Sequence, residues 1–253
     1  MKRFAWWAVL VTLFLGVATM VHGQAADPAV PRNGLVLWLR ADEGVEKDAV
    51  GYVTAWRDQS GRGNDAVAED LTEPLFVASW LSGQPAIRFN ASDTFLRVPH
   101  AEELNAGDGF SVFIVYSYSK GGRLAQKKNA ASGVNPDAWF LATATGLGVS
   151  GVYHEEHLFF PDMPYLQTNI FDAQAGTVKI YDSGWLVGTV EGVGAMEPNE
   201  DDLYIGKRHR PGSSESYFGG EIAEMMIYDR ALGDEERQAV EKYLADKYGL
   251  MLF

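Results

Sequence analysis

The stretch GGEIAEMMIYDRALGDEERQAVEKYLADKYGL, residues 219–250, indicates how the fold is completed. Residues 222–228 are apolar on both faces of a strand, apart from Glu224, and this pattern is typical of a strand inside a sheet. Glu224 then needs a partner or solvent. Alternation predicts Ala223, Met225 and Ile227 on one face of the strand and Ile222, Met226 and Tyr228 on the other.

A short helix is predicted directly after this strand. Gly233 or Asp234 can cap it, and the acidic residues that follow suit the positive end of a helix dipole. Gly249 stands where a left-handed residue ends a helix. We expect the helix to dock on a sheet and complete the core through one apolar stripe, formed by Val240, Tyr243, Leu244 and Tyr248.

The chain before this stretch has the pattern of many short strands separated by turn residues. The clearest hairpin is TVKIYDSGWLVGTV, residues 177–190, with its turn at 182–184. Further strands are expected at 35–39, 53–56, 86–89, 94–98, 110–118, 139–142, 148–153 and 203–205. The pattern predicts one all-β domain over 34–253, an antiparallel β-sandwich with a docked C-terminal helix.

The N-terminus has the three parts of a secretory signal. Lys2 and Arg3 precede an uncharged apolar run at 4–21, and small residues follow at 23–26. We expect a signal peptide at 1–25 and a short linker at 26–33, and hence a secreted, periplasmic or cell-surface protein. An uncleaved membrane anchor is the alternative. The chain has no cysteine, so core packing has to hold the exported domain together.

Charge narrows the range of partners. The formal net charge is −13, and loss of Lys2 and Arg3 with the leader would take it to −15. Such an acidic chain lacks the basic face that nucleic acid requires, and it does not attract anionic lipid. We expect no nucleic acid and no membrane contact after signal cleavage, and the remaining partner classes are a glycan or a cell-envelope or surface protein.

The pattern Y-D-R-A-L-x-x-E-E-R-x-x-V-x-x-Y-L-x-x-K-Y-G-L, from Tyr228 to Leu250, resembles the C-terminal signature of bacterial laminin G-like (LamG) domains. Three more stretches fit: LVLWLRAD at 35–42, WRDQSGRGND at 56–65, and VKIYDSGWLVGT at 178–189 with Tyr204-Ile205-Gly206. The resemblance implies the jelly-roll fold of the concanavalin A-like lectin/glucanase superfamily. This superfold hosts lectins, hydrolases, lyases and adhesion modules, so it leaves the function open.

The sequence carries no recognisable catalytic motif. The resemblance implies E-x-D-x-x-E for glucanases of this superfamily, and the string is absent. Glu221 and Glu224 are three residues apart, so we expect them on opposite faces of their strand. The sequence HEEH at 154–157 has its histidines three apart rather than four, which favours an exposed polar loop over a zinc site.

A glycine-rich turn at 58–65 is the candidate metal site. Asp58 and Asp65 offer carboxylate oxygens, which calcium prefers, and calcium is familiar among lectin-like relatives. The turn lacks the further carboxylates of an EF-hand loop, so a purely structural turn is the alternative. No other cofactor is predicted.

Candidate ligand-binding residues are aromatic or basic side chains near turns. Aromatic rings stack on sugars, and arginine pairs with sulfate or carboxylate. The candidates are Trp139, Tyr153, Tyr165 and Trp185, with Arg208 and Arg210 from the basic run at 207–210. The alternatives are core packing for the aromatic residues and a solvated turn for the arginines.

These observations favour an exported, non-catalytic binding module that recognises carbohydrate or a cell-surface partner. Two alternatives stay open. One is a polysaccharide hydrolase or lyase whose catalytic groups are dispersed along the chain, and the other is a self-associating structural protein of the cell envelope.

Overall fold

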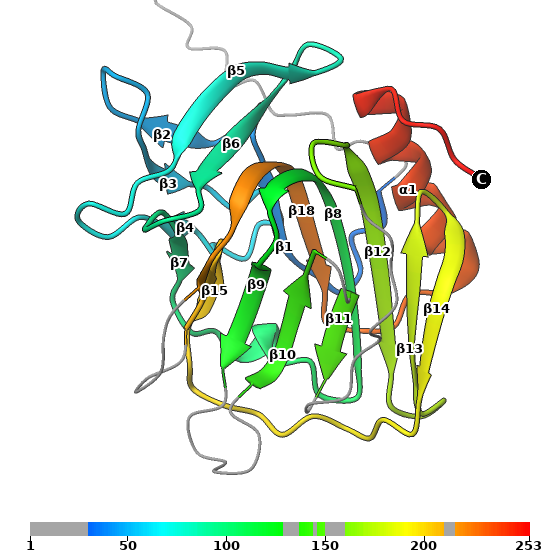
Figure 1. Cartoon of the computed structure of the whole chain (residues 1–253). Helices are drawn as coiled ribbons and strands as arrows, with labels where there is room; N and C mark the ends of the chain where they lie inside the picture. The colour runs from blue at the N-terminus through cyan, green and yellow to red at the C-terminus, as the bar shows by residue number, and fades with distance from the viewer. Residues whose placement is uncertain (1–29, 129–136, 144–145, 150–159, 210–215) are drawn as a thin grey trace, which may run out of the picture.

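The structure is a computed structural model that describes residues 30–128, 137–143, 146–149, 160–209 and 216–253. Two antiparallel sheets lie face to face, and a single helix lies on the outer side of one of them (Figure 1). The predicted all-β sandwich with a docked helix is confirmed.

Sheet A is the larger layer and contacts the helix. Its path runs β14-β13-β12-β8-β18-β6-β5, and β1 pairs with the second half of β18. In path order its strands are β14 (Trp185–Glu191), β13 (Thr177–Asp182), β12 (Tyr165–Asp172), β8 (Gly109–Lys120), β18 (Gly219–Tyr228), β6 (Gln84–Asn90), β5 (Leu75–Leu81) and the branching β1 (Leu35–Arg40).

Sheet B forms the other layer and faces the viewer in Figure 1. In path order its strands are β11 (Gly146–Val149), β10 (Asp137–Ala142), β9 (Arg123–Lys128), β15 (Leu203–Ile205), β7 (Leu96–Val98), β4 (Ala66–Val67), β3 (Val53–Trp56) and β2 (Val45–Lys47). The remaining elements are the small pair β16 (Lys207–Arg208) and β17 (Ser216–Tyr217), the 3-10 turn η1 (Glu102–Leu104) and helix α1 (Asp234–Tyr248).

The predicted hairpin and helix form as expected. β13 and β14 are joined by Ser183 and Gly184, which both have positive φ and so suit a tight hairpin turn. Helix α1 follows Gly233 and ends at Gly249, whose φ of 66° and ψ of 32° are left-handed. Strands β5, β9 and β12 were not predicted, although β12 lies in the middle of sheet A.

Two apolar layers hold the sandwich together. The first fills the space between the sheets and includes Leu37, Ile114, Trp139 and Ile205. The second lies between sheet A and α1, where Val240, Leu244 and Tyr248 are buried against the sheet. Sheet A is therefore apolar on both faces, which explains the continuous apolar run in β18.

A β-bulge in β18 changes the predicted faces. The pairing with β8 shifts between Ile222 and Glu224, so alternation slips by one residue. Ile222 lies between the sheets with Met225, whereas Ala223 packs against α1. The prediction that Ala223 shares a face with Met225 was therefore wrong.

The same bulge overturns the prediction for the two glutamates of β18. Glu221 precedes the inward-facing Ile222 and binds Ser117 Oγ at 2.7 Å on the outer face of sheet A. Glu224 binds side chains of α1, so it lies on that outer face too. Glu221 and Glu224 were expected on opposite faces, and the extra residue in the strand places them on one.

Glu224 is fully buried and joins the sheet to the helix. Its two oxygens accept hydrogen bonds from Trp38 Nε1 at 2.6 Å, Tyr243 OH at 3.1 Å, Lys247 Nζ at 2.6 Å and Tyr248 OH at 2.9 Å. Burial and the charge of Glu224 raise the pKa of both tyrosines, which keeps them protonated as donors. The partner that the sequence required for Glu224 is thus supplied by α1 and β1.

Replacing Glu224 by alanine should destabilise the domain strongly. The change breaks the buried Lys247–Glu224 ion pair, leaving Lys247 with Asp42 as its remaining carboxylate, and it removes the acceptor of the Trp38, Tyr243 and Tyr248 donors. Breaking a buried ion pair costs about 3–5 kcal/mol. The control is Asp246→Ala on α1, which removes a carboxylate from an exposed ion pair with Lys242, so its cost should be about 1 kcal/mol or less. Urea unfolding of both variants measures the difference, and equal costs would contradict the role given to Glu224.

Candidate functional site

The predicted calcium turn is held by its own hydrogen bonds. Asp58 Oδ1 accepts from the backbone N–H groups of Trp38 and Ser60, both at 2.8 Å. Asp58 Oδ2 accepts from Ser60 Oγ at 2.6 Å and from the N–H groups of Gly63 and Asn64. Both oxygens are therefore taken by donors, and the arrangement is that of a structural turn.

Asp65 completes the same turn. Its oxygens accept from the backbone N–H of Asp58 at 2.8 Å and from the guanidinium of Arg57 at 2.7 Å. Across the ranges that the structure describes, no three His, Asp or Glu side chains gather as metal ligands. The sequence HEEH at 154–157 lies outside these ranges.

The predicted ligand residues that the structure describes do not come together. Trp139 is fully buried and packs on Phe110 with ring centroids 4.6 Å apart, so it serves the core. Tyr165 is buried as well and packs on Tyr116. Trp185 is 63% exposed, but it starts β14 at the opposite side of the molecule from β15 in Figure 1. Tyr153 and Arg210 lie outside the described residues.

Arg208 lies on the outer face of sheet B, beside an ordered row of side chains. The strand registers pair Gly148 with Phe140, Phe140 with Gln126, Gln126 with Tyr204, and Tyr204 with Arg97. Neighbouring strands are about 4.8 Å apart, so this row crosses β11, β10, β9, β15 and β7 without a break. We call these five residues the outer row.

Basic groups surround the aromatic members of the outer row. The Arg123 guanidinium lies 3.2 Å from the ring centroid of Phe140. The His209 ring stacks on Tyr204 with ring centroids 4.6 Å apart. The backbone carbonyl of His209 accepts a hydrogen bond from Gln126 Nε2 at 3.0 Å. Basic and aromatic side chains therefore alternate on this face of an acidic protein.

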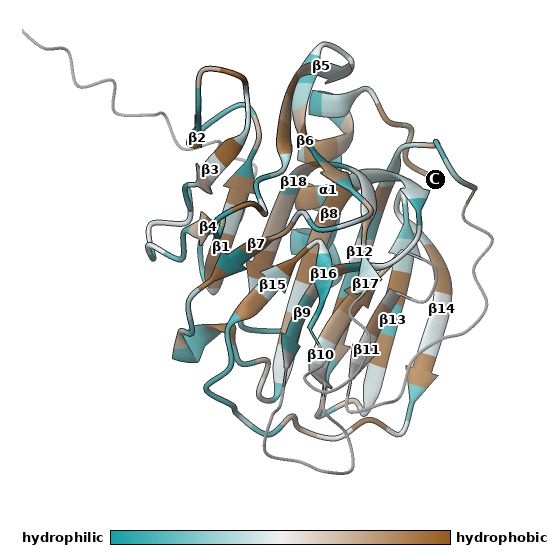
Figure 2. Cartoon of the chain, turned by 60° about the vertical axis from the view of Figure 1, so that its left-hand side comes forward, coloured by the Kyte–Doolittle hydropathy of each residue, from teal (hydrophilic) through white to brown (hydrophobic). Residues whose placement is uncertain are grey.

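Backbone and packing explain how this face is built. The Phe140 ring lies across Gly148, where a Cβ atom would be 2.1 Å from it, so only glycine leaves room. Lys207 is buried with its ammonium group 4.2 Å from the Phe95 ring centroid and 5.7 Å from those of Tyr204 and Tyr217. This cation anchors β16, which Figure 2 shows as a hydrophilic segment in the middle of the face.

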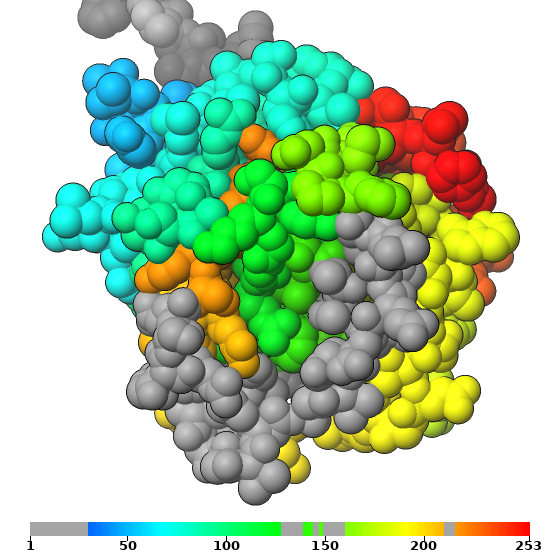
Figure 3. Space-filling model, viewed as in Figure 1, coloured from blue at the N-terminus to red at the C-terminus, as the bar shows by residue number. Residues whose placement is uncertain are grey.

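Exposure divides the face into covered and accessible parts. Phe140 and Gln126 are buried, whereas Arg97, Arg123, Tyr204, Arg208 and His209 are half-buried. In the space-filling view, green residues of the β9 and β10 region and orange residues of the β15 and β16 region are visible beside each other (Figure 3). These half-buried side chains are the part of the face that a ligand can contact.

The electrostatics of the face set the protonation of its groups. Burial, then the charges of Asp202 and Glu69, raise the pKa of Tyr204, so its hydroxyl stays protonated at neutral pH. A hydrogen bond from Arg97 to Asp202, at 2.8 Å, raises the pKa of Arg97 and fixes its guanidinium. The face thus offers hydrogen-bond donors.

The sequence analysis missed most of this face. Arg97, Phe140 and Tyr204 were not candidates because each lies within a strand rather than near a turn, and Arg123, which starts β9 after Gly121-Gly122, was not singled out. Their position was still readable in part, since each alternates with core residues such as Leu96 and Leu203. What sequence alone cannot show is that five strands bring them into register.

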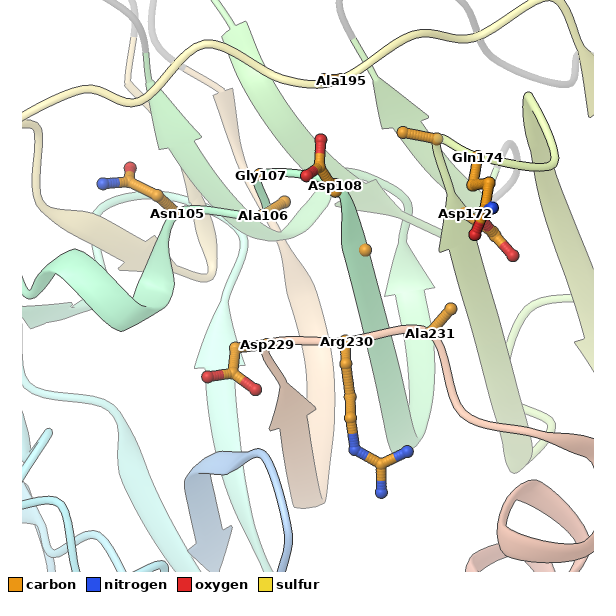
Figure 4. A pocket seen from close by; sticks show the side chains of 12 residues that line it. Asn105, Ala106, Gly107, Asp108, Asp172, Gln174, Ala195, Asp229, Arg230 and Ala231 are labelled. Atoms are coloured by element: carbon orange, nitrogen blue, oxygen red, sulfur yellow. The ribbon is translucent and has the colours of Figure 1, made fainter.

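Apart from the outer face of sheet B, a recess lies among loops at one end of the sandwich and has a volume of about 870 Å³. Asp108 and Asp172 line it, and Asp172 Oδ1 is used to accept from Ala175 N at 3.0 Å. In Figure 4 Arg230 points away from Asp108. Its guanidinium binds Glu236 of α1 at 2.8 and 2.6 Å. The recess is therefore lined by acidic side chains, and the guanidinium of Arg230 is engaged by Glu236 rather than by them.

Lys127 is a further buried basic group, at the end of β9. Its ammonium group lies 3.0 Å from Nδ1 of His100 and also donates to the carbonyl of Asp201. Because an ammonium group can only donate, Nδ1 acts as the acceptor in this contact. Burial lowers the pKa of Lys127 to about 8, although nearby acids including Asp201 act in the opposite direction.

Comparison with known families identifies part of the chain. A family model described as the concanavalin A-like lectin/glucanases superfamily matches residues 168–236, from β12 to the first turn of α1. In these residues the chain is similar to that superfamily. The resemblance seen in the sequence is therefore confirmed. A sequence search of curated proteins finds no match.

Solved structures with the same fold are distant in sequence. A Trypanosoma rangeli sialidase mutant with trans-sialidase activity has a TM-score of 0.59 and 15% identity, covering 88% of this chain and 34% of its own. The receptor-binding domain of a botulinum neurotoxin C/D mosaic has a TM-score of 0.57 and 14% identity, covering 84% of this chain and 52% of its own. The chain spans about a third of the sialidase and half of the toxin domain, and at these identities the likeness shows the fold alone.

No helix within the described residues is long and apolar enough to cross a membrane.

Removing the Asp58 carboxylate should unfold the turn at 58–65. Asp58→Ala leaves the partly buried N–H groups of Trp38, Ser60 and Asn64 without an acceptor, at a cost of about 2–3 kcal/mol. The exposed Asp70→Ala carries the same charge change and should be nearly neutral. In wild type, adding calcium or a chelator should leave the melting temperature unchanged. A rise with calcium that is lost in Asp58→Ala would support a metal site instead.

Lys127 should make stability depend on pH in the alkaline range. The unfolded chain keeps a lysine pKa of about 10.4, whereas the folded value is about 8. Between these values the unfolded state binds one more proton, so the free energy of unfolding rises with pH by up to about 1.4 kcal/mol per unit. Lys127→Met should remove this rise, and exposed Lys179→Met should keep it. Urea unfolding at a series of pH values tests this, and parallel profiles for wild type and Lys127→Met would refute it.

Proposed function

We propose that the chain is an exported, non-catalytic module that binds an acidic carbohydrate on the outer face of sheet B. The observation that carries the proposal is the outer row with its basic neighbours Arg123, Arg208 and His209. An aromatic ring offers a flat apolar surface, and arginine offers paired donors to a carboxylate or sulfate.

Charge supports an anionic rather than a neutral ligand. The chain carries a net charge of −13, so an anion is repelled by most of its surface and needs a local basic patch. Arg208 is half-buried and belongs to the short strand β16, whose position the buried Lys207 fixes. A guanidinium held in this way loses little freedom on binding.

The outer face of sheet A is a poor competitor for this role. Helix α1 covers much of it, and buried side chains such as Val240 and Leu244 fill the interface. The described loops at the end of the sandwich carry Asp108 and Asp172, which repel an acidic glycan. Export of the chain stays a prediction from residues 1–25.

Binding of the acidic carbohydrate is expected to depend on the positive charge of Arg208 and on the aromatic ring of Tyr204. Arg208→Ala and Tyr204→Ala should each weaken binding of a sulfated or uronate-rich polysaccharide about tenfold. Arg62→Ala removes the same charge from the exposed turn at 58–65 and should bind as wild type does. Isothermal titration at low and high salt measures this, and binding should weaken with salt. Equal affinity for neutral polysaccharides, or no binding to any, would overturn the proposal.

A polysaccharide lyase is the second candidate, favoured by the grouping of Tyr204, His209 and Arg208. Proton abstraction beside a uronate carboxyl group needs a base and a group that neutralises the carboxylate. The raised pKa of Tyr204 makes it a proton donor rather than that base. Incubation with uronate polysaccharides separates the two functions, because a lyase forms an unsaturated product that absorbs ultraviolet light, and a binding module forms none.

A further inference from the structure

Strand β14 forms an open edge of sheet A. Within the described chain it pairs only with β13, and it lies at the right-hand border of the sheet in Figure 1. Its seven residues, WLVGTVE, contain no lysine, arginine or proline, and Glu191 is the one charge. Natural sheets protect exposed edges with charges, proline, β-bulges or very short strands. β14 has one bulge, at Val187, where its pairing with β13 shifts between Leu186 and Gly188, and it has little other protection.

The other sheet edges in the described residues are better protected. β2 has three residues, two of which are Glu46 and Lys47. β11 has four residues. β5 is as long as β14 and uncharged, but its start is covered, because Phe76 N donates to Gly51 O at 2.9 Å and Val53 N donates to Pro74 O at 2.8 Å. Strand β1 also pairs on one side only, but the turn at 58–65 covers its other side, because Trp38 N donates to Asp58 Oδ1 at 2.8 Å and Gln59 N donates to Trp38 O at 2.7 Å. Among the described residues, the edge at β14 is therefore the longest one without such cover.

An exposed apolar rim adjoins this edge. Trp185 is 63% exposed and Leu186 47% exposed at the start of β14. Residues 251–253 lie against the same turn, since Phe253 N donates to Ser183 O at 3.0 Å. Met251 and Phe253 are 74% and 75% exposed. Aromatic and aliphatic side chains from two distant parts of the chain thus gather beside one open strand.

We propose that β14 and this rim form an isologous interface with a second copy of the chain, in which two sheets A join edge to edge. Antiparallel pairing about a two-fold axis places the start of one β14 opposite the end of the other. Glu191 then meets the Trp185 end of its partner rather than another Glu191. Apolar and β-branched residues face each other over the middle of the strand.

The low charge of this edge favours a second copy of the chain over a lipid surface. Two copies that each carry −13 repel over most of their surfaces, so they can meet only where the charge is low, and β14, with Glu191 as its one charge, is such a stretch. Peripheral helices and rims that bind bilayers add lysine or arginine around the apolar residues. β14 and residues 251–253 contain neither.

The area that a stable dimer needs explains why the rim is part of the interface. Specific interfaces bury about 1,000 Å² or more in total, and one pair of edge strands supplies only part of this area. Trp185, Leu186 and Phe253 add large apolar side chains on each copy. The interface therefore requires both the strand and the rim, and it makes no use of the outer face of sheet B.

The test is the concentration dependence of mass for the purified full chain, by sedimentation velocity or light scattering. Wild type should convert from monomer to dimer as concentration rises. The double variant Leu186→Lys/Thr189→Lys changes two exposed positions on the edge and brings like charges together across the axis. It should raise the dissociation constant about a hundredfold or more.

Two further variants keep the test specific. Phe253→Ser should raise the dissociation constant about tenfold through lost apolar contact. Val50→Lys adds the same charge at a site that is 75% exposed outside the proposed interface, and it should dimerise as wild type does. Circular dichroism confirms that each variant folds. A monomer at every concentration, or a dimer that the double variant leaves unchanged, would overturn the proposal without bearing on glycan binding.

Discussion

The buried carboxylate of Glu224 is the interaction on which the arrangement of layers depends. A charged group with no exposed surface is tolerated only when donors surround it, and α1 supplies three of the four donors in Tyr243, Lys247 and Tyr248. The fourth, Trp38 Nε1, comes from β1. These bonds tie three residues of the helix to one point on sheet A, and the hydrogen bond from Ser82 Oγ to Tyr248 O, at 2.8 Å, adds a second point. Directional bonds of this kind specify a position more narrowly than the apolar packing of Val240 and Leu244 does.

This constraint decides which surfaces remain for function. Helix α1 covers much of the outer face of sheet A, and sheet A carries apolar residues on both sides. The outer face of sheet B and the edge at β14 are left. The first gathers basic groups around Tyr204 and Phe140, and the second is nearly uncharged. An acidic protein therefore presents two surfaces that differ in charge from the rest, and each suits a different kind of partner.

Local chemistry made much of the fold predictable, and register limited the rest. The hairpin at Ser183-Gly184 and the helix end at Gly249 follow from the backbone freedom of glycine, which acts locally. The faces of β18 failed at Ala223 because a single extra residue inverts alternation, and nothing in the sequence EIAEMM marks where it sits. Strand β12, YLQTNIFD, was missed since Gln167 and Asn169 are polar yet fully buried, which breaks the apolar pattern that marks a central strand.

The candidate site was harder to predict than the fold for a related reason. Arg208 was found because it belongs to a visible basic run, while Arg97, Gln126, Phe140 and Tyr204 are separated by up to about a hundred residues and meet only through pairing of β10, β9, β15 and β7. Antiparallel pairing fixes which residues stand opposite each other. A shift of any of these strands by one residue in register would therefore turn its member of the outer row towards the core. The core residues that alternate with the row, Leu96, Leu203 and Ile205 among them, resist that slip because it would expose them. The packing that stabilises the sandwich is thus also what holds the basic and aromatic side chains in line on its outer face.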